Sequence, residues 1–191
     1  MSVREVVQIG DPVLREASRE LQPDEIGSPE TQGLIDDLID TRRATHGAGI
    51  AANQVGEAVR VAIVEVEKGN PRYPYKPPVP LTVMINPVLE PLGDEMVEIN
   101  EGCLSVPDLR GSLERHLAVR VRYLDRDGVE HEEVRRGLTA GTFQHEVDHL
   151  NGTLFVDRAD PRTFATWEQF DRHQREQFVR RATRLVDEVG S

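Results

Sequence analysis

Two histidines and a glutamate stand at helical spacing in the segment QHEVDHL, residues 144–150. On an α-helix, residues four apart lie on the same face, so His145 and His149 can direct two imidazoles at one point. Glu146 follows His145 directly, where its carboxylate can hydrogen-bond a water molecule held by a metal and act as a general base. The pattern predicts a metal-binding helix, although a short H-E-x-x-H match also occurs by chance in helices that bind nothing.

Apolar residues recur at helical spacing around this segment, at Phe143, Val147, Leu150 and Leu154. Such a stripe predicts a helix packed into a core. Two imidazoles and two carboxylates beside the stripe would be costly to bury without partners. A bound metal ion would supply the partner, so the surroundings favour a site over a chance match.

The chain contains a single cysteine, Cys103, in the segment EGCLS at 101–105. It cannot form an intramolecular disulfide, which leaves an inert buried thiol, a nucleophile or a metal ligand. Composition alone favours the inert thiol. A thiolate beside two imidazoles would instead complete a three-ligand site with one open position, which is the arrangement of a catalytic metal.

A run of small residues, GAGIAANQ, occupies positions 47–54. With so little side-chain bulk, a ligand or another backbone can approach the main-chain N–H and C=O groups closely. A phosphate-binding loop is disfavoured because no P-loop lysine follows. A tight turn packed against a helix remains the alternative, and Gln54 is the polar residue best placed at the end of the run.

The elements that must position these residues can be read from caps and periodicity. Ser28 and Pro29 begin a helix that we expect over about 29–45, ending at Gly47. Alternating or continuous apolar residues predict strands, and Asp127-Gly128 predicts a hairpin turn. The expected strands are 59–64, 81–85, 117–123 and about 129–135. The segment 69–80 carries five prolines and is expected to be a surface loop without assigned chemistry.

Length and charge limit the class of protein. A chain of 191 residues suits one domain, with or without an appended element. A formal net charge of -11 argues against bulk binding to nucleic acid or to an anionic membrane. No apolar run of about 18 residues is present, and the N-terminus lacks the apolar core of a secretory signal. We therefore expect a cytoplasmic protein with no DNA and no membrane partner.

Taken together, the three segments resemble the peptide deformylase family, whose signatures are G-x-G-φ-A-A-x-Q (φ apolar), E-G-C-L-S and Q-H-E-x-D-H. They stand here at 47–54, 101–105 and 144–149, in the order of the family. The resemblance extends from about Val3 to Asp157. Ala48 and Asn53 depart from the usual residues, which bears on the pocket wall and substrate preference rather than on the reaction.

The resemblance implies an α+β fold, with antiparallel β-sheets packed around a central metal-binding α-helix, an N-terminal helix and an appended C-terminal helix. We expect a catalytic domain at 1–157 and a helical extension at 158–191. The implied reaction is hydrolysis of the formyl group from the N-terminal formyl-methionine of new polypeptides, with release of formate.

The resemblance also assigns roles to individual residues. Cys103, His145 and His149 would hold one divalent metal, with Fe²⁺ expected first and Zn²⁺ or Ni²⁺ as substitutes. Glu146 would be the general base and then the general acid. The Gln54 side chain and the Leu104 backbone N–H would stabilise the oxyanion.

Substrate and supporting roles are carried over in the same way. The main chain at Gly49 and Ile50 would pair with an extended substrate. Ile99 and Leu138 are candidates for the wall of the methionine pocket. Arg110 either orients a carboxylate near the metal or is an ordinary surface arginine, and Asp148 is expected to anchor the helix through a charged hydrogen bond.

The segment after Asp157 is an addition to the motif-bearing region. Between residues 172 and 184 it carries five arginines and one acid, Glu176. This local basic face suggests docking on ribosomal RNA near the exit of the nascent chain. The alternative is the solvated face of a helix that packs on its own domain or on a second copy of the chain.

Two other functional classes share part of the pattern. A zinc peptidase would use His145, Glu146 and His149, but such enzymes usually take a third histidine or glutamate ligand downstream, and the C-terminal segment has no such motif. A non-enzymatic binding relative would keep the fold without the chemistry. Because all the motif residues are present, inactivation by loss of a ligand is excluded.

Overall fold

The structure is a computed structural model that describes residues 2–191. Its helices are α1 (Pro23–Ile26), α2 (Pro29–Thr45), α3 (Gly137–Leu150), α4 (Trp167–His173) and α5 (Arg175–Val189). Its strands are β1 (Gly49–Ala51), β2 (Val61–Val66), β3 (Val79–Pro91), β4 (Met96–Cys103), β5 (Val106–His116), β6 (Ala118–Leu124) and β7 (Glu130–Arg136). Short 3-10 turns occupy Pro12–Arg15, Ala52–Val55, Phe155–Asp157 and Pro161–Thr163.

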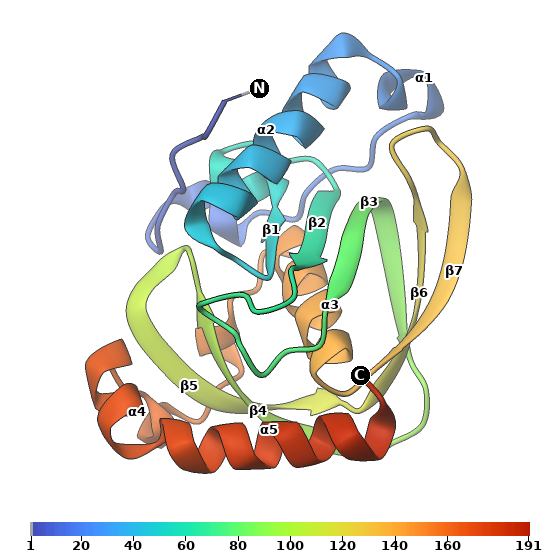
Figure 1. The fold of residues 1–191 in the computed structure, drawn as a ribbon. Coiled ribbons are helices and arrows are strands. Elements are labelled where there is room, and N and C mark those ends of the chain that lie inside the picture. The colour runs from blue at the N-terminus through green and yellow to red at the C-terminus, as the bar shows by residue number, and fades with distance from the viewer. Residues whose placement is uncertain (1) are drawn as a thin grey trace.

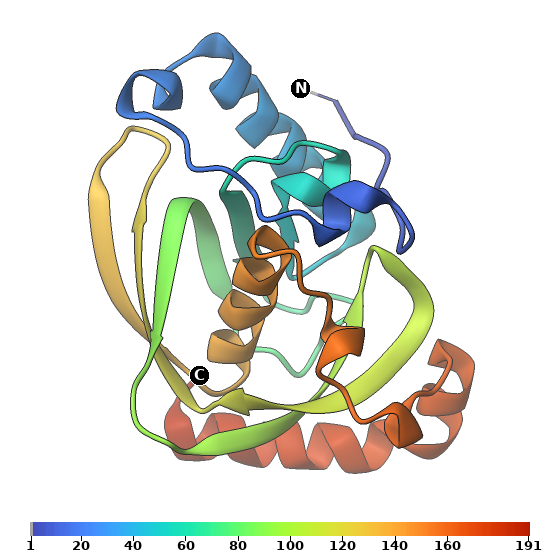
Figure 2. The same ribbon diagram turned by 180° about the vertical axis from the view of Figure 1, so that it is seen from behind.

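Two antiparallel sheets enclose α3. Five strands form one sheet in the order β1-β2-β3-β6-β7, and β4 and β5 form a separate hairpin. Figures 1 and 2 show α3 between the five-stranded sheet and this hairpin. The helix α2 lies at the end of the molecule opposite to α5. All but one residue of α3 are buried, so the helix is the centre of the core. The predicted α+β architecture around a central helix is confirmed.

The N-terminal helix spans 29–45, as its capping residues predict. The Ser28 hydroxyl accepts a hydrogen bond from Thr31 N, and Pro29 occupies the first turn. The cap at the other end is His46, which adopts a left-handed conformation with φ of 53°. The helix is therefore capped one residue before the glycine expected to stop it, and Gly47 lines the cavity of the site instead.

Three of the four predicted strands are shifted by only one or two residues, but the end of β3 is wrong. The strand continues through Asn86-Pro87 to Pro91, with a register shift between Ile85 and Val88. Asn86 is left-handed there, and its side chain bonds both the N–H and the C=O of Leu21. Asn-Pro thus marks a bulge, a position where a strand tolerates proline.

The β4–β5 hairpin was not predicted as strands. Apolar alternation fails there because the hairpin buries polar side chains, including Asn100, Glu101, Arg110 and Arg115. Leu104 and Ser105 form the two-residue turn between the strands, directly after Cys103. Because the buried face of this hairpin is polar, its strands cannot be predicted from the alternation of apolar and polar residues.

Asp160-Pro161 has the residue types of a helix start, but no α-helix begins there. Residues 161–163 make a single 3-10 turn, after which Ala165 pairs in extended form with Arg110. A helix begins only at Trp167, with the Thr166 hydroxyl accepting from Gln169 N, and α5 follows after a break at Gln174. Pairing with β5 competes with helix formation here.

The C-terminal segment packs on the rest of the chain. Phe170, Phe178 and Ala182 share a buried cluster with Ile99 of β4 and Leu138 of α3. Figure 1 shows α5 lying along β4 at one edge of the molecule. The division into units at 1–157 and 158–191 stays a prediction. Within residues 2–191, no helix combines the length and apolarity needed to cross a bilayer.

Candidate functional site

Three candidate metal ligands meet in the core although they come from distant segments. The ligand atoms of Cys103, His145 and His149 all lie within 4.8 Å of one another, and Cys103 Sγ is 3.2 Å from His149 Nε2. Cys103 stands at the end of β4, and the two histidines stand one turn apart on α3. A thiolate and two imidazoles are a donor set that binds Zn²⁺ and related divalent metals well, so the residues present fit a metal.

His145 is oriented by a carboxylate. Its Nδ1 lies 2.8 Å from Glu101 Oε2, and because a carboxylate only accepts hydrogen bonds, Nδ1 carries the hydrogen. Nε2 is then free to bind a metal, which is the usual arrangement of a histidine ligand. Glu101 is in turn held by two hydrogen bonds from Arg115, of 2.8 and 2.9 Å.

Arg115 links this carboxylate to Asp148. Its Nη1 donates to Asp148 Oδ2 at 2.5 Å, while Arg158 donates to the other oxygen at 2.9 Å. Arg115 is 3% exposed, so the network is almost fully desolvated. Asp148 therefore anchors α3 by charged hydrogen bonds, and the arginine that orients the carboxylate near the ligands is Arg115 rather than Arg110.

The charges of the cluster favour the ligand form of the thiol. Burial raises the pKa of Cys103, but the neighbouring imidazoles outweigh it and hold that pKa well below its usual range. Burial lowers the pKa of His145, and hydrogen bonds with Cys103 and Glu101 outweigh it and raise that pKa. The site thus stabilises a thiolate, the protonation state that binds metals.

Glu146 is buried beside the ligands and faces Gly49. It is 3% exposed, burial raises its pKa, and its Oε2 has no hydrogen-bond partner in the described chain. A Cβ at Gly49 would lie 2.3 Å from Glu146 Oε1, so any larger residue at position 49 would displace the carboxylate or the strand. An unpartnered carboxylate oxygen in this position can accept a proton or hold a water molecule.

Gln54 reaches the site from the 3-10 turn after β1. Its Oε1 accepts from Ala51 N at 2.9 Å, which fixes the amide. Its Nε2 donates to Ser105 Oγ at 3.1 Å and lies 3.5 Å from Cys103 Sγ. Asn53, one of the departures from the family pattern, donates to His149 O at 2.6 Å and supports the ligand helix.

A cavity of about 610 Å³, partly open to solvent, adjoins the ligands. Gly49, Gln54, Cys103, Leu104, His145 and Glu146 line it, together with the predicted wall residues Ile99 and Leu138. Ile50 does not line it. Its side chain is fully buried in the cluster around α2, because strand alternation directs it away from Gly49.

Sequence reasoning missed several residues of the cavity wall. Tyr73, Tyr75 and Lys76 enter it from the proline-rich segment, and Phe178 enters from α5. No chemistry could be assigned to this segment from the sequence, and the structure places three of its side chains in the cavity wall. The two tyrosines and the lysine between prolines could have suggested a role for this loop. Nothing in the sequence, however, predicts that the loop lies over α3.

Lys76 is the unusual group in this wall. Its Nζ donates to Thr142 Oγ1 at 2.7 Å and lies 5.0 Å from the centre of the Tyr73 ring. Burial is the main reason why its pKa falls from 10.5 to about 8. The folded protein therefore holds a partly desolvated ammonium at neutral pH.

Lys76→Met is expected to stabilise the protein at pH 7 by about 1–3 kcal/mol, since a shift of one pKa unit is worth 1.36 kcal/mol. The folded pKa lies below the unfolded one, so the unfolded state binds more protons between them. The cost of Lys76 is thus fully present below about pH 8 and declines as pH rises towards 10.5. Urea unfolding of both proteins at pH 7 and 9.5 measures the difference.

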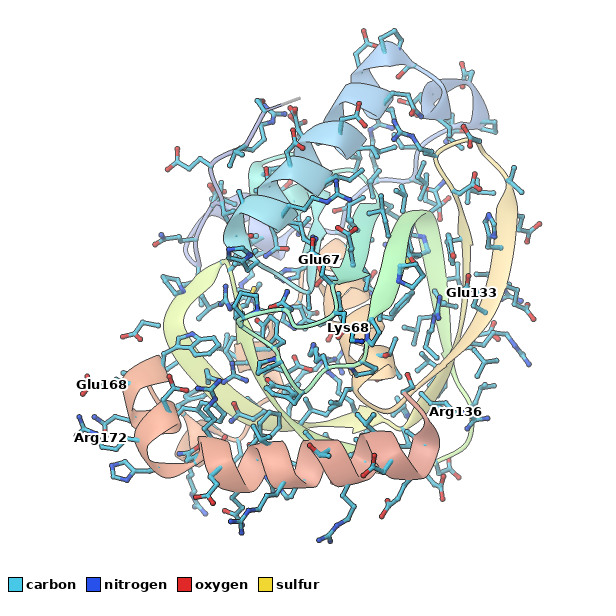
Figure 3. The ribbon with its side chains drawn as sticks, viewed as in Figure 1. Glu67, Lys68, Glu133, Arg136, Glu168 and Arg172 are labelled. Carbon is cyan, nitrogen blue, oxygen red and sulfur yellow. The ribbon has the colours of Figure 1, made fainter. Side chains whose placement is uncertain are left out.

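Lys68→Met is the matched control, because Lys68 precedes the same segment and is exposed (Figure 3). It should change the free energy of unfolding by less than about 0.5 kcal/mol. A Lys76→Met difference that is equal at both pH values would contradict the assignment of the cost to the ammonium.

Comparisons with known proteins agree with the geometry. A family model described as polypeptide deformylase matches residues 3–165. Peptide deformylase of Leptospira biflexa is 41% identical over 158 residues, covering 83% of this chain and 88% of that protein. Peptide deformylase 1A, chloroplastic/mitochondrial, of Arabidopsis thaliana is 42% identical over 175 residues, covering 87% and 65%. The Met-Ala-Ser-bound class I type b peptide deformylase of Acinetobacter baumannii superposes with a TM-score of 0.79 at 43% identity, covering 83% and 99%.

Proposed function

The chain belongs to the polypeptide deformylase family, and on that premise we propose that Cys103, His145 and His149 hold the divalent metal on which its activity depends. The enzyme removes the N-terminal formyl group from new polypeptides. The observation that carries the ligand assignment is the convergence of three ligand atoms within 4.8 Å beside a cavity. The alternative of a zinc peptidase is not favoured, because the third donor is a cysteine upstream of the helix.

The metal we expect is Fe²⁺, with Zn²⁺ or Ni²⁺ as substitutes. One thiolate with two imidazoles suits all three, so the ligands alone do not select among them. When bound, such an ion acidifies a coordinated water molecule and polarises the oxygen of the scissile group. The remaining chemistry belongs to side chains of this protein.

Glu146 is placed to move the proton. Its unpartnered Oε2 can take the proton of the attacking water and pass it to the amine nitrogen that leaves. Gln54 Nε2 and the Leu104 N–H are the donors we assign to the oxyanion, and both residues line the cavity. One such donor is typically worth about 3–4 kcal/mol at the transition state.

The substrate backbone has an open strand edge to pair with. β1 is the terminal strand of the five-stranded sheet, and Gly49 and Ile50 lie within it. An extended peptide can add to such an edge through main-chain hydrogen bonds. The Met-Ala-Ser complex of the Acinetobacter relative supports a methionine-first peptide as the ligand, and Ile99, Leu138 and Phe178 give this cavity an apolar wall.

Gly49→Ala should test this placement. The added methyl group would overlap Glu146 Oε1, so the carboxylate or β1 must move. We expect kcat/KM for a formyl-methionyl peptide to fall about 10- to 100-fold, since displacements of about 1 Å can have effects of this size. Gly33→Ala, on the exposed face of α2 with open space around its Cβ, is the control and should keep full activity.

A formate-release assay on formyl-Met-Ala-Ser tests the function. The protein is purified without oxygen, its metal is quantified, and chelated protein is reloaded with Fe²⁺, Zn²⁺ or Ni²⁺. We expect turnover that follows metal content, highest with Fe²⁺. Cys103→Ala should lose both metal and turnover, and a variant that retains one metal per chain would overturn the ligand assignment.

Docking of α5 on ribosomal RNA and a cytoplasmic location remain proposals. Phe178 and Ala182 on one side of α5 are buried, and four of the five arginines predicted to form the basic face make ion pairs with acids of this chain. These contacts favour the alternative of a helix packed on its own domain. The double variant Arg180→Gln, Arg184→Gln can be compared with the natural protein by co-sedimentation with ribosomes. Docking through α5 predicts that less of the variant sediments, and an unchanged amount would contradict it.

A further inference from the structure

Three arginines of the described chain are almost completely buried. Arg42 is 0% exposed, Arg110 is 1% exposed and Arg115 is 3% exposed. The first and the last are each neutralised by two carboxylates, which are Glu65 and Glu67 for Arg42, and Glu101 and Asp148 for Arg115. Arg110 makes no ion pair with any residue of 2–191.

The contacts of Arg110 are neutral. Its Nε donates to Asn100 Oδ1 at 2.7 Å and its Nη2 donates to Asn100 O at 2.8 Å. Its guanidinium lies 4.3 Å from the ring centre of Trp167 and 4.4 Å from that of Phe170. Its Nη1 is buried and has no hydrogen-bond partner in the described part of the chain. Aromatic faces offset only part of the cost of burying a charge, so an anion beside this guanidinium would be stabilised.

This guanidinium forms part of the wall of a second cavity. The cavity holds about 410 Å³, part of it open to solvent, and lies between the proline-rich segment and the start of α5. Arg72 and Arg175 also line it, and Asp171 is the one acid among its lining residues, so three arginines stand against a single acid. The nearest Arg175–Asp171 distance is 3.8 Å, which is too long for a hydrogen bond.

The second cavity adjoins the catalytic one. Tyr75 and Arg110 line both, so the two cavities lie next to each other and share these two residues as a wall. Burial raises the pKa of Tyr75 to about 12, which keeps its hydroxyl protonated and able to donate. The shared wall thus presents hydrogen-bond donors and positive charge.

We propose that this second cavity is a carboxylate-binding subsite of the enzyme, with Arg110 as its buried anchor and Arg72 and Arg175 at its rim. The planar forks of guanidinium groups match carboxylates in geometry as well as charge. The inference rests on the proposed function for the source of the ligand. Two carboxylates occur in that reaction, namely an acidic side chain shortly after the formyl-methionine, and the formate that is released.

Charge-matched peptides test the subsite. The pairs are formyl-Met-Glu-Ala-amide with formyl-Met-Gln-Ala-amide, and formyl-Met-Ala-Glu-amide with formyl-Met-Ala-Gln-amide, which differ in charge at nearly constant volume. Amidation removes the terminal carboxylate. With the metal-loaded enzyme we expect the Glu member of at least one pair to have a KM roughly 3- to 10-fold lower, with little change in kcat.

Arg175→Gln should reduce this Glu/Gln ratio to below about 2, because it removes a guanidinium at the rim of the cavity whose side chain is 44% exposed. Arg172→Gln is the matched control. Arg172 pairs with Glu168 on the outside of α4, away from the cavity (Figure 3), and its loss should leave the ratio unchanged.

A formate arm separates the two sources. Turnover of the Gln peptides is compared in sodium formate and in sodium chloride at equal ionic strength. Inhibition by formate that weakens in Arg175→Gln identifies formate as the ligand, and a Glu/Gln ratio that falls in the same variant identifies the side chain. Equal KM values in both pairs, with formate inhibition unchanged in Arg175→Gln, overturn the proposal.

A binding measurement distinguishes failure of the proposed function from failure of the proposed subsite. Calorimetric binding of the unformylated peptides Met-Glu-Ala-amide and Met-Gln-Ala-amide needs no turnover. Loss of formate release with every peptide, while Glu peptides still bind more tightly, would reject the function and retain the subsite. Equal binding of Glu and Gln peptides, in both sequence positions and with active enzyme, would reject the subsite alone.

Discussion

Glu146→Gln is expected to lower kcat for a formyl-methionyl peptide by about 10²- to 10⁴-fold, the range for loss of a general acid-base group. Glutamine has nearly the same shape, so it fills the position against Gly49, but it cannot take a proton. Burial raises the pKa of the natural carboxyl, so a neutral side chain should be at least as stable in the folded protein. Formate release under anaerobic conditions, with metal per chain measured in parallel, gives the result.

Measuring the metal content shows whether kcat falls because proton transfer is lost or because the metal is no longer bound. Glu146 belongs to no metal ligand set in the structure, so Glu146→Gln should retain about one metal per chain. Glu168→Gln, at an exposed position of α4 (Figure 3), is the control and should leave kcat unchanged. A Glu146→Gln enzyme with full metal and kcat within 10-fold of the natural protein would remove Glu146 from proton transfer.

The part of the site carried by local spacing could be predicted from the sequence. His145 and His149 face one point because four residues make about one helical turn. A role for Gly49 in close backbone approach could be predicted because a run of small residues is uncommon unless the main chain must be accessible. The helix 29–45 is predictable because its cap is formed by residues only three positions apart, Ser28 and Thr31. In each case the physical cause lies within a few positions along the chain.

The remaining parts depend on tertiary contacts that leave no local pattern. Arg115 is buried because Glu101 and Asp148 neutralise it, and both lie far from it in the sequence. Lys76 lines the catalytic cavity because the proline-rich segment folds over α3, where Thr142 accepts its hydrogen bond. Lysine and arginine are usually surface residues, so the sequence alone predicts exposed positions for Lys76 and Arg115. The fold shows that Arg115 is buried and that Lys76 lies in the wall of a cavity.

Arg115 also carries the second large effect that we expect. Arg115→Leu should lower the free energy of unfolding by about 3–5 kcal/mol, because it removes the buried guanidinium that pairs with Glu101 and leaves Asp148 with only the half-exposed Arg158. Burial raises the pKa of Glu101, and Arg115 outweighs that effect and holds it well below its usual range. In the variant, protonation of the buried carboxylates removes their uncompensated charge, so its deficit in free energy of unfolding relative to the natural protein should be smaller at pH 5 than at pH 7. Urea unfolding at pH 7 and pH 5 measures both quantities.

Arg158→Leu is the control for this network. Arg158 contacts the same Asp148, but its side chain is 53% exposed, so its loss should change the free energy of unfolding by less than about 1 kcal/mol. A similar cost for both variants would mean that burial of the Arg115 ion pairs contributes little.

Arg115→Lys separates charge from geometry. A lysine restores a positive charge between the two carboxylates but cannot give Glu101 the paired hydrogen bonds that a guanidinium gives. Since Glu101 sets the orientation of His145, the lysine variant should recover stability while still binding metal about 10- to 100-fold more weakly. Metal competition with a chelator measures this affinity without turnover. Full recovery of both quantities would show that the network needs only charge, and that the fork of Arg115 does not orient the ligand.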